Sequence, residues 1–210
     1  MNQQLPVITM KLILASSSPY RQALLRDVGL NVSAVGARVD EYSIVGQTPI
    51  ETAQRRAQAK AKAVFDNHPD HIVIGADQVC YIDDVVMDKP KSSAEWFSRL
   101  QAMRGRSHNL STAVCLMGRG ATEEDSVLTA FVETTQVHFR SDLSDADLQA
   151  YVDIGEARKC AGGYMMEQRG AWLIEKIEGD WQNVIGLPIF PLLGHLKTLG
   201  CPVFGPANIE

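Results

Sequence analysis

The chain has 210 residues, 45% of them hydrophobic, and a formal net charge of −5 at pH 7. This composition can bury a substantial core and excludes a largely disordered chain. The acidic balance, with basic residues spread along the sequence, argues against a protein that binds duplex nucleic acid by neutralising phosphates. A small anionic ligand needs only a local cluster of positive charge and remains compatible with it.

Short apolar runs alternate with amphipathic segments, which is typical of an α/β protein. In chain order the sequence predicts a strand at 11–15, a helix at 19–28, a strand at 31–41 that runs into a loop, a helix at 49–66, a strand at 71–76, a helix at 92–103, strands at 110–118 and 128–140 around an acidic turn at 121–126, a helix at 144–151, a strand at 171–180 and a helix at 188–200. Because no repeat, low-complexity tract or long linker interrupts the pattern, we expect residues 1–210 to form a single domain.

The first segment that could take part in binding or catalysis is SSSPYR at 16–21, between a predicted strand and a predicted helix. Ser18 is a favoured N-cap residue and Pro19 a favoured first helical residue. A helix amino end offers free N–H groups and a positive dipole end, which suit a phosphate. Arg21 lies in this first turn, where its charge is unfavourable unless an anion binds. The alternative is a capped helix with an exposed arginine.

Lys60 is the second candidate, in the helix at 49–66. At 100° per residue, Ala53, Ala57, Ala61 and Val64 form one apolar stripe, and Lys60 falls within it. A lysine in that position must either extend its ammonium outward to water or meet a buried anion.

Asp77 is the third candidate, because it follows the apolar strand at 71–76. An acidic side chain at the carboxyl end of a central strand lies where open α/β sheets place ligand chemistry. It could act as a general base or a metal ligand, or simply form a turn. Glu41 adds a second carboxylate, and Lys89, in the turn DKP, adds a cation.

The four cysteines, Cys80, Cys115, Cys160 and Cys201, are widely spaced and include no Cys-x-x-Cys pair, so the sequence predicts neither a zinc site nor a disulfide framework. We expect reduced, mostly buried thiols. Residues 1–10 lack the basic and apolar regions of a signal peptide, and no segment approaches the roughly 18 apolar residues of a membrane span. We therefore expect a cytoplasmic protein.

Several of these segments occur together in one order. They are LILASSSPYRQALL at 12–25, VDE at 39–41, AKAKA at 59–63, IGADQV at 74–79, KP at 89–90, RGRSH at 104–108, CAGGY at 160–164 and IEGDWQNVIGLPI at 177–189. In this combination the chain resembles the Maf family of nucleoside triphosphate pyrophosphatases, from about residue 11 to 200. The resemblance implies an elongated, twisted mixed sheet with helices and two lobes around a central cleft, similar to the inosine triphosphatase-like group.

The resemblance also implies hydrolysis of a nucleoside triphosphate between its α and β phosphates, with Mg²⁺ or Mn²⁺ as cofactor. It makes Asp77 the proton acceptor that activates water, and Glu41 an acidic residue that helps to hold the metal or orients water. It places Lys60 and Lys89 among the catalytic residues at the phosphates. The matching phosphate-binding positions in the first motif are Ser16, Ser18 and Arg21.

Three positions bear on the base. Most family members have Arg where this chain has Tyr20, and dTTP/UTP-specific members have Thr and Gln where it has Gln78 and Glu167. In having an aromatic residue, Gln and Glu at these three positions, the chain resembles the branch of the family that acts on 7-methyl-GTP. That branch more often has Trp in place of Tyr20. The aromatic ring can attract the cationic base, and the Glu167 carboxylate can accept hydrogen bonds from guanine.

The alternatives are a pyrophosphatase for dTTP, UTP or another modified nucleotide, and a nucleotide-binding regulator of septum formation, a process with which the family is linked. The expected partner is a small nucleotide, with no nucleic acid and no membrane. A homodimer is also compatible with the resemblance, because dimerisation is common in the family.

His108 could approach a phosphate or serve a hydrogen-bonding role in a loop, while Trp96, Trp172 and Trp181 are expected to be packing or interface residues.

Overall fold

The computed structural model describes residues 11–119, 126–158 and 160–202. Their strands are β1 (Leu12–Leu14), β2 (Val32–Ala34), β3 (Ile72–Ile82), β4 (Val85–Val86), β5 (Ser107–Met117), β6 (Val127–Phe139) and β7 (Ile174–Glu178). The α-helices are α1 (Pro19–Asp27), α2 (Pro49–Phe65), α3 (Ser93–Met103), α4 (Asp145–Ile154), α5 (Trp181–Ile185) and α6 (Ile189–Thr198), and the 3-10 helices are η1 (Glu41–Ser43), η2 (Ala161–Gly163) and η3 (Arg169–Leu173).

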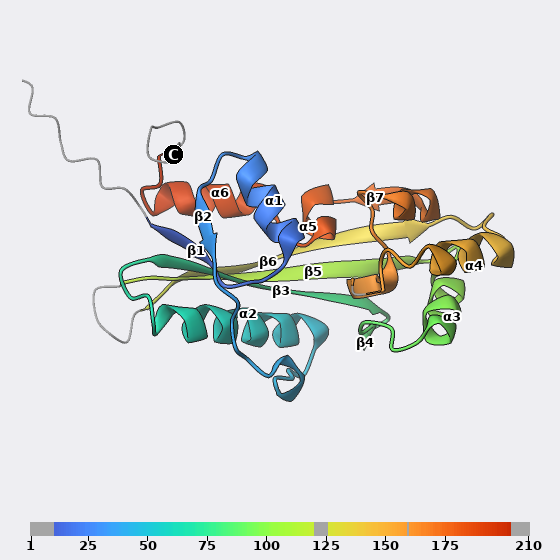
Figure 1. Ribbon diagram of the computed structural model, residues 1–210, viewed down its shortest axis with the longest axis horizontal. Helices are drawn as coiled ribbons and strands as arrows, with labels where there is room; N and C mark the ends of the chain where they lie inside the picture. Colours follow the sequence, from blue (N-terminus) through green and yellow to red (C-terminus); the bar gives the residue numbers. More distant parts are fainter. Residues whose placement is uncertain (1–10, 120–125, 159, 203–210) are drawn as a thin grey trace, which may run out of the picture.

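All seven strands belong to one mixed sheet, in the order β2-β1-β3-β5-β6-β7 with β4 paired to β3. The pairs β1–β2 and β1–β3 are parallel, whereas β3–β5, β5–β6 and β6–β7 are antiparallel. The long strands β3, β5 and β6 run through most of the molecule, which gives it an elongated shape (Figure 1). The expected mixed α/β fold is confirmed.

Helices cover both faces of the sheet at the end that contains β1 (Figure 1). Alternate residues of β1 divide between two cores, since Leu12 and Leu14 pack with α1 and α6 while Ile13 packs with α2. A third core at the other end joins α3 and α4 to β5 and β6 around Trp96 and Phe139. The first two cores lie at the end of the sheet that contains β1 and together form one lobe, and the third core forms the other.

Several boundaries differ from the sequence prediction. The strand expected at 71–76 continues to Ile82, so the prediction that Asp77 follows its carboxyl end is wrong: Asp77 lies inside β3. The reason is that β5 pairs with β3 continuously from Val73 to Tyr81, and backbone pairing does not require apolar side chains. Strand β4 and helix α5 were not predicted, and the first part of the strand expected at 171–180 is η3.

Other expectations are confirmed. Ser18 caps α1, and Ser144 and Asp147 form a capping box on α4. The four cysteines are free thiols, and Cys160 is the one that is only partly buried. Trp96 packs in the core as expected, whereas Trp172 and Trp181 are exposed, so a packing role is wrong for these two and an interface role for them stays a prediction. The acidic turn expected at 121–126 lies mostly outside the described residues and stays a prediction.

Among residues 11–119, 126–158 and 160–202, the structure contains no helix that could span a membrane.

Candidate active site

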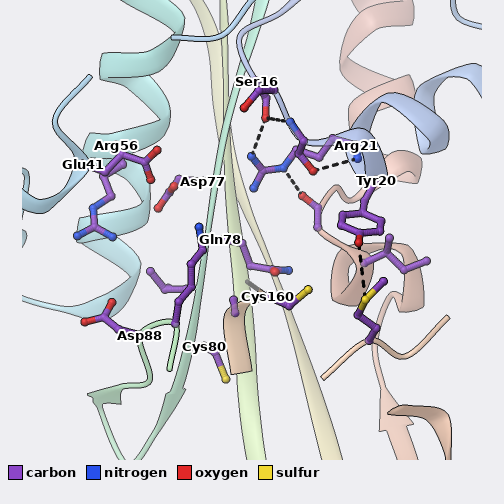
Figure 2. Close-up of a pocket in the computed structure, with 18 of the residues that line it drawn as sticks. Ser16, Tyr20, Arg21, Glu41, Arg56, Asp77, Gln78, Cys80, Asp88 and Cys160 are labelled. Atoms are coloured by element: carbon purple, nitrogen blue, oxygen red, sulfur yellow. Dashed lines mark hydrogen bonds between the residues drawn. The ribbon is translucent and has the colours of Figure 1, made fainter. Parts of the chain in front are cut away.

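A cavity of about 880 Å³ opens between the two ends of the sheet. Its wall includes the β1–α1 loop, η1, α2, β3, the segment after β4, the segment 155–167 and the end of α5. Every site residue predicted from the sequence lines this one cavity, namely Ser16, Ser18, Tyr20, Arg21, Glu41, Lys60, Asp77, Gln78, Lys89 and Glu167. In Figure 2, Glu41 and Asp77 lie on one side and Tyr20 and Arg21 on the other.

An ion-paired group of Glu41, Lys60 and Asp77 forms a charged centre on one side of the cavity. Lys60 Nζ lies 2.6 Å from Asp77 Oδ1 and 3.0 Å from Glu41 Oε2. The side chains of Lys60 and Asp77 are 9% and 6% exposed, whereas that of Glu41 is 46% exposed. Of the two alternatives for Lys60, the structure shows that it meets a buried anion.

Close packing of α2 on β3 brings Lys60 to Asp77. A Cβ at Gly75 would lie 2.3 Å from Ala57 O and 2.7 Å from Ala61 Cβ, so only glycine permits this approach. The stripe of alanines on α2 is fully buried against the sheet at this level. Small residues on both elements therefore position the catalytic candidates.

The carboxylates of this centre can accept further ligands. Asp77 Oδ2 is buried without a hydrogen-bond partner. Burial alone would raise the pKa of Glu41, but the nearby Lys60, with Lys89 and Arg56, lowers that pKa below its ordinary value. Within the described residues no group of three or more His, Cys, Asp or Glu side chains is placed to hold a metal ion. Glu41 and Asp77 thus fit a hard cation such as Mg²⁺ only if other ligands complete its shell.

The first motif forms a tight loop and helix start opposite this centre. Ser18 Oγ accepts a hydrogen bond from Arg21 N at 3.4 Å, and Ser16 Oγ accepts one from Ser18 N at 3.2 Å. The Arg21 side chain is only partly free, because Nε donates to Gly186 O at 2.8 Å and Nη1 donates to Ala76 O at 3.0 Å. Arg21 therefore ties α1 to β3 and α5, and its Nη2 group is the part left to contact a phosphate.

Tyr20 and Glu167 line another part of the cavity. Tyr20 Oη lies 3.6 Å from Met165 Sδ, so the ring is held against the segment that ends in Glu167. Burial and the charge of Glu156 raise the pKa of Glu167. Cys160 and Glu156 also line this region, and burial and Glu167 raise the pKa of the Cys160 thiol to about 11. A carboxylate beside an aromatic ring can bind a cationic or hydrogen-donating base.

Gln78 is both a cavity residue and a structural link. Its Nε2 donates to Asn183 O at 2.6 Å and to Thr112 Oγ1 at 3.2 Å. The amide orientation follows from the partner, because a backbone carbonyl can only accept. Asn183, fully buried, continues the link by donating from Nδ2 to Leu110 O and Thr135 Oγ1. Gln78 can therefore offer only its oxygen, Oε1, to a ligand.

Comparison with known proteins identifies the family. The family model described as "Maf-like protein" matches residues 11–199. The chain belongs to the Maf-like protein family. A dTTP/UTP pyrophosphatase from Symbiobacterium thermophilum is 42% identical over 196 residues, which cover 92% of this chain and 96% of the relative. A 7-methyl-GTP pyrophosphatase from Cupriavidus metallidurans is 39% identical over 195 residues, with the same coverage of both chains.

A solved structure is also similar to this Maf-like chain. The Ham1 protein of Staphylococcus aureus superposes with a TM-score of 0.42 and 15% identity, over 62% of this chain and 72% of its own.

Sequence reasoning missed some residues of the Maf-like cavity. Arg56, one turn before Lys60 on α2, also lines it, and its Nε donates to Ile44 O at 3.0 Å. That bond steadies the segment after Glu41, and the α2 periodicity could have indicated it, since residues 56 and 60 share a face. His108 is 1% exposed inside β5, with Nε2 2.7 Å from Tyr164 Oη, so of its two alternatives it has the hydrogen-bonding role, though in a strand rather than a loop.

Proposed function

We propose that the protein hydrolyses 7-methyl-GTP between its α and β phosphates, releasing 7-methyl-GMP and pyrophosphate, and so removes a modified nucleotide from the pool used for RNA synthesis. One observation carries the proposal: a single cavity holds both a lysine-bound pair of carboxylates and a separate aromatic and carboxylate subsite. The first is suited to phosphate chemistry and the second to a cationic base. The family assignment supports the pyrophosphatase reaction, and relatives of both base specificities are consistent with it.

In the proposed reaction, Asp77 accepts a proton from the attacking water. In the structure Oδ1 is paired with Lys60 and Oδ2 has no hydrogen-bond partner, so Oδ2 is the oxygen available to accept the proton. Glu41 and Asp77 would hold Mg²⁺ or Mn²⁺, which when bound would neutralise phosphate oxygens and orient water. Lys60 and Lys89 would contact the phosphates directly.

The amino end of α1 would bind the phosphate chain from the opposite wall. Ser16, Ser18 and the free Nη2 group of Arg21 lie there beside the positive end of the helix dipole. Because Tyr20 belongs to the first turn of the same helix, one element would contact both the phosphates and the base. Binding at this helix end would therefore set the distance between base and scissile bond.

The base subsite would select a methylated guanine. The Tyr20 ring face attracts a cation by about 0.5–2 kcal/mol in such contacts. Glu167 contributes a negative charge and two acceptor oxygens toward the donor groups of guanine. A dTTP/UTP pyrophosphatase is the second candidate, and the 42% identity to a relative of that name favours it.

The test is pyrophosphate release from 7-methyl-GTP, GTP, UTP, dTTP, CTP and inosine triphosphate with Mg²⁺ or Mn²⁺. The matched control is Asp77→Asn, which keeps the size of the side chain and removes its basic oxygen. We expect a clear preference for 7-methyl-GTP that the control abolishes. Preference for UTP or dTTP would reject the base assignment, and no turnover of any nucleotide would reject the enzymatic proposal.

A further inference from the structure

The Lys60 ammonium lies between the two carboxylates that the proposed reaction needs for a divalent cation. Lys60 Nζ is 3.0 Å from Glu41 Oε2 and 2.6 Å from Asp77 Oδ1, so one ammonium contacts both. Figure 2 shows Glu41 and Asp77 on the same side of the cavity. A divalent cation on these carboxylates would bring two further positive charges close to the ammonium.

We propose that Lys60 is an internal counter-ion that keeps the divalent-cation affinity of the nucleotide-free protein low, and that nucleotide phosphates raise this affinity by drawing the ammonium away from Glu41 and Asp77. This inference rests on the proposed function, because it assigns an order to the loading of the same site. Cation and nucleotide then bind with positive coupling, and each strengthens the other by the same factor.

Charge and burial support this coupling. With Lys60 in place the three groups carry a formal charge of about −1, and without it about −2, so the lysine halves the attraction for a cation. The Lys60 and Asp77 side chains are 9% and 6% exposed, and water therefore screens their interaction poorly. Removing the ammonium leaves Asp77 with an uncompensated buried charge that a metal ion can neutralise.

The number of protein ligands supports the order of loading. Across the part of the chain that the structure describes, no third His, Cys, Asp or Glu joins Glu41 and Asp77 in a metal-binding group. Mg²⁺ is usually bound by one or two carboxylates together with substrate phosphates and water. The phosphates thus supply the missing ligands and, at the same time, an alternative anion for Lys60, whose flexible four-carbon stem allows the ammonium to move.

The experiment measures Mn²⁺ binding by the electron paramagnetic resonance signal of free Mn²⁺. Wild type, Lys60→Met and Lys62→Met are titrated alone and with the non-hydrolysable α,β-methylene analogue of 7-methyl-GTP, after the affinity of Mn²⁺ for the analogue itself has been measured. Lys62 is the matched control because it lies on the same helix, 63% exposed, and pairs with Asp66 rather than with the site. The substitution therefore removes an equal charge from α2 without touching Glu41 or Asp77.

We expect the analogue to tighten Mn²⁺ binding to wild type and Lys62→Met by roughly 5–150-fold, the usual range of coupling between sites. Lys60→Met should bind Mn²⁺ more tightly than wild type without nucleotide and should lose most of the coupling. If Lys60→Met does not fold, as judged by circular dichroism, Lys60→Gln replaces it, because the amide keeps a hydrogen-bond donor but not the charge.

Failure of this inference can be told from failure of the proposed function. If nucleotides are hydrolysed but the uncharged variants bind Mn²⁺ no more tightly than wild type, the counter-ion role is wrong and the reaction stands. If those variants bind Mn²⁺ more tightly while wild type hydrolyses no nucleotide, the counter-ion role stands and the reaction is wrong.

Discussion

Substitution of Gly163 by alanine should lower the free energy of unfolding of the protein and disturb the proposed base subsite. Gly163 has φ +74°, and a Cβ there would lie 2.8 Å from Nε1 of Trp96. The same indole nitrogen donates to Gly163 O at 2.6 Å, and Trp96 is 1% exposed in the core between α3 and α4. The new methyl group therefore meets a buried ring at the atom that forms the hydrogen bond.

The expected loss has two parts. The left-handed conformation costs a non-glycine residue about 1–2 kcal/mol. Displacing the indole leaves a buried N–H unpaired, which costs about 1–3 kcal/mol more. Gly163→Ala should thus lower the free energy of unfolding by about 2–5 kcal/mol. Gly29 is the matched control, since its φ is +77° and nothing lies within 4 Å of a Cβ placed there, so Gly29→Ala should lose only the first part.

Urea unfolding followed by tryptophan fluorescence measures both variants. An unchanged slope with a lower midpoint reports lost stability. Because the segment from Cys160 to Glu167 contributes Glu167 to the proposed base subsite, Gly163→Ala should also reduce kcat/KM for the preferred nucleotide, whereas Gly29→Ala should not. Equal losses of stability in the two variants would show that the contact with Trp96 does not limit this turn, and the reasoning would be refuted.

Three further predictions follow from the site and its support. Glu167→Gln should lower kcat/KM for 7-methyl-GTP by roughly tenfold or more, since a charged hydrogen bond contributes about 1.5–3 kcal/mol. It should lower kcat/KM for GTP less, because only the methylated base carries the positive charge that the carboxylate attracts; equal losses for the two nucleotides would contradict the base assignment. Burial lowers the pKa of His108 from 6.5 to about 3, so the unfolded state binds the proton first and stability falls as the pH drops from about 6.5 toward 3. His108→Leu should reduce the change of the free energy of unfolding with pH, as measured by urea titrations at several pH values. An equal pH dependence in wild type and the variant would exclude a contribution from His108. Arg21→Lys cannot reproduce the hydrogen bonds from Nε and Nη1, so the free energy of unfolding should fall by about 1–3 kcal/mol in thermal unfolding. A melting curve equal to that of wild type would show that these bonds do not hold α1 to β3 and α5.

The α2 helix shows how far the sequence can specify the site. Its alanine stripe predicts the buried face, and the position of Lys60 within that stripe predicts either an outward-reaching ammonium or a buried partner. Periodicity cannot choose between them, because the partner, Asp77, belongs to β3 and is brought near only by packing at Gly75. The choice depends on tertiary contacts between segments that are separate in the sequence.

Strand β3 shows the opposite limit. Gly75 and the polar pair Asp77 and Gln78 look like the end of a strand, yet β3 continues to Ile82 because β5 pairs with it throughout. Both polar residues are tolerated in this central strand because each has a partner. Lys60 neutralises the charge of Asp77, and Asn183 O accepts a hydrogen bond from Gln78. The residues that interrupt the apolar pattern of the strand in the sequence, Gly75, Asp77 and Gln78, are therefore the ones that form or position the candidate site.

The commitment of Gln78 restricts how the proposed base subsite can read its ligand. Since Nε2 already donates to Asn183 O and Thr112 Oγ1, Gln78 can contact a base only as an acceptor through Oε1. Glu167 is also an acceptor when ionised. Two acceptors suit a base edge with adjacent donors, such as the N1–H and exocyclic amine of guanine. Uracil and thymine present one N–H between two carbonyl oxygens, and those oxygens would meet acceptors without a proton to share. The polar groups of this subsite therefore favour guanine independently of the charge that methylation adds.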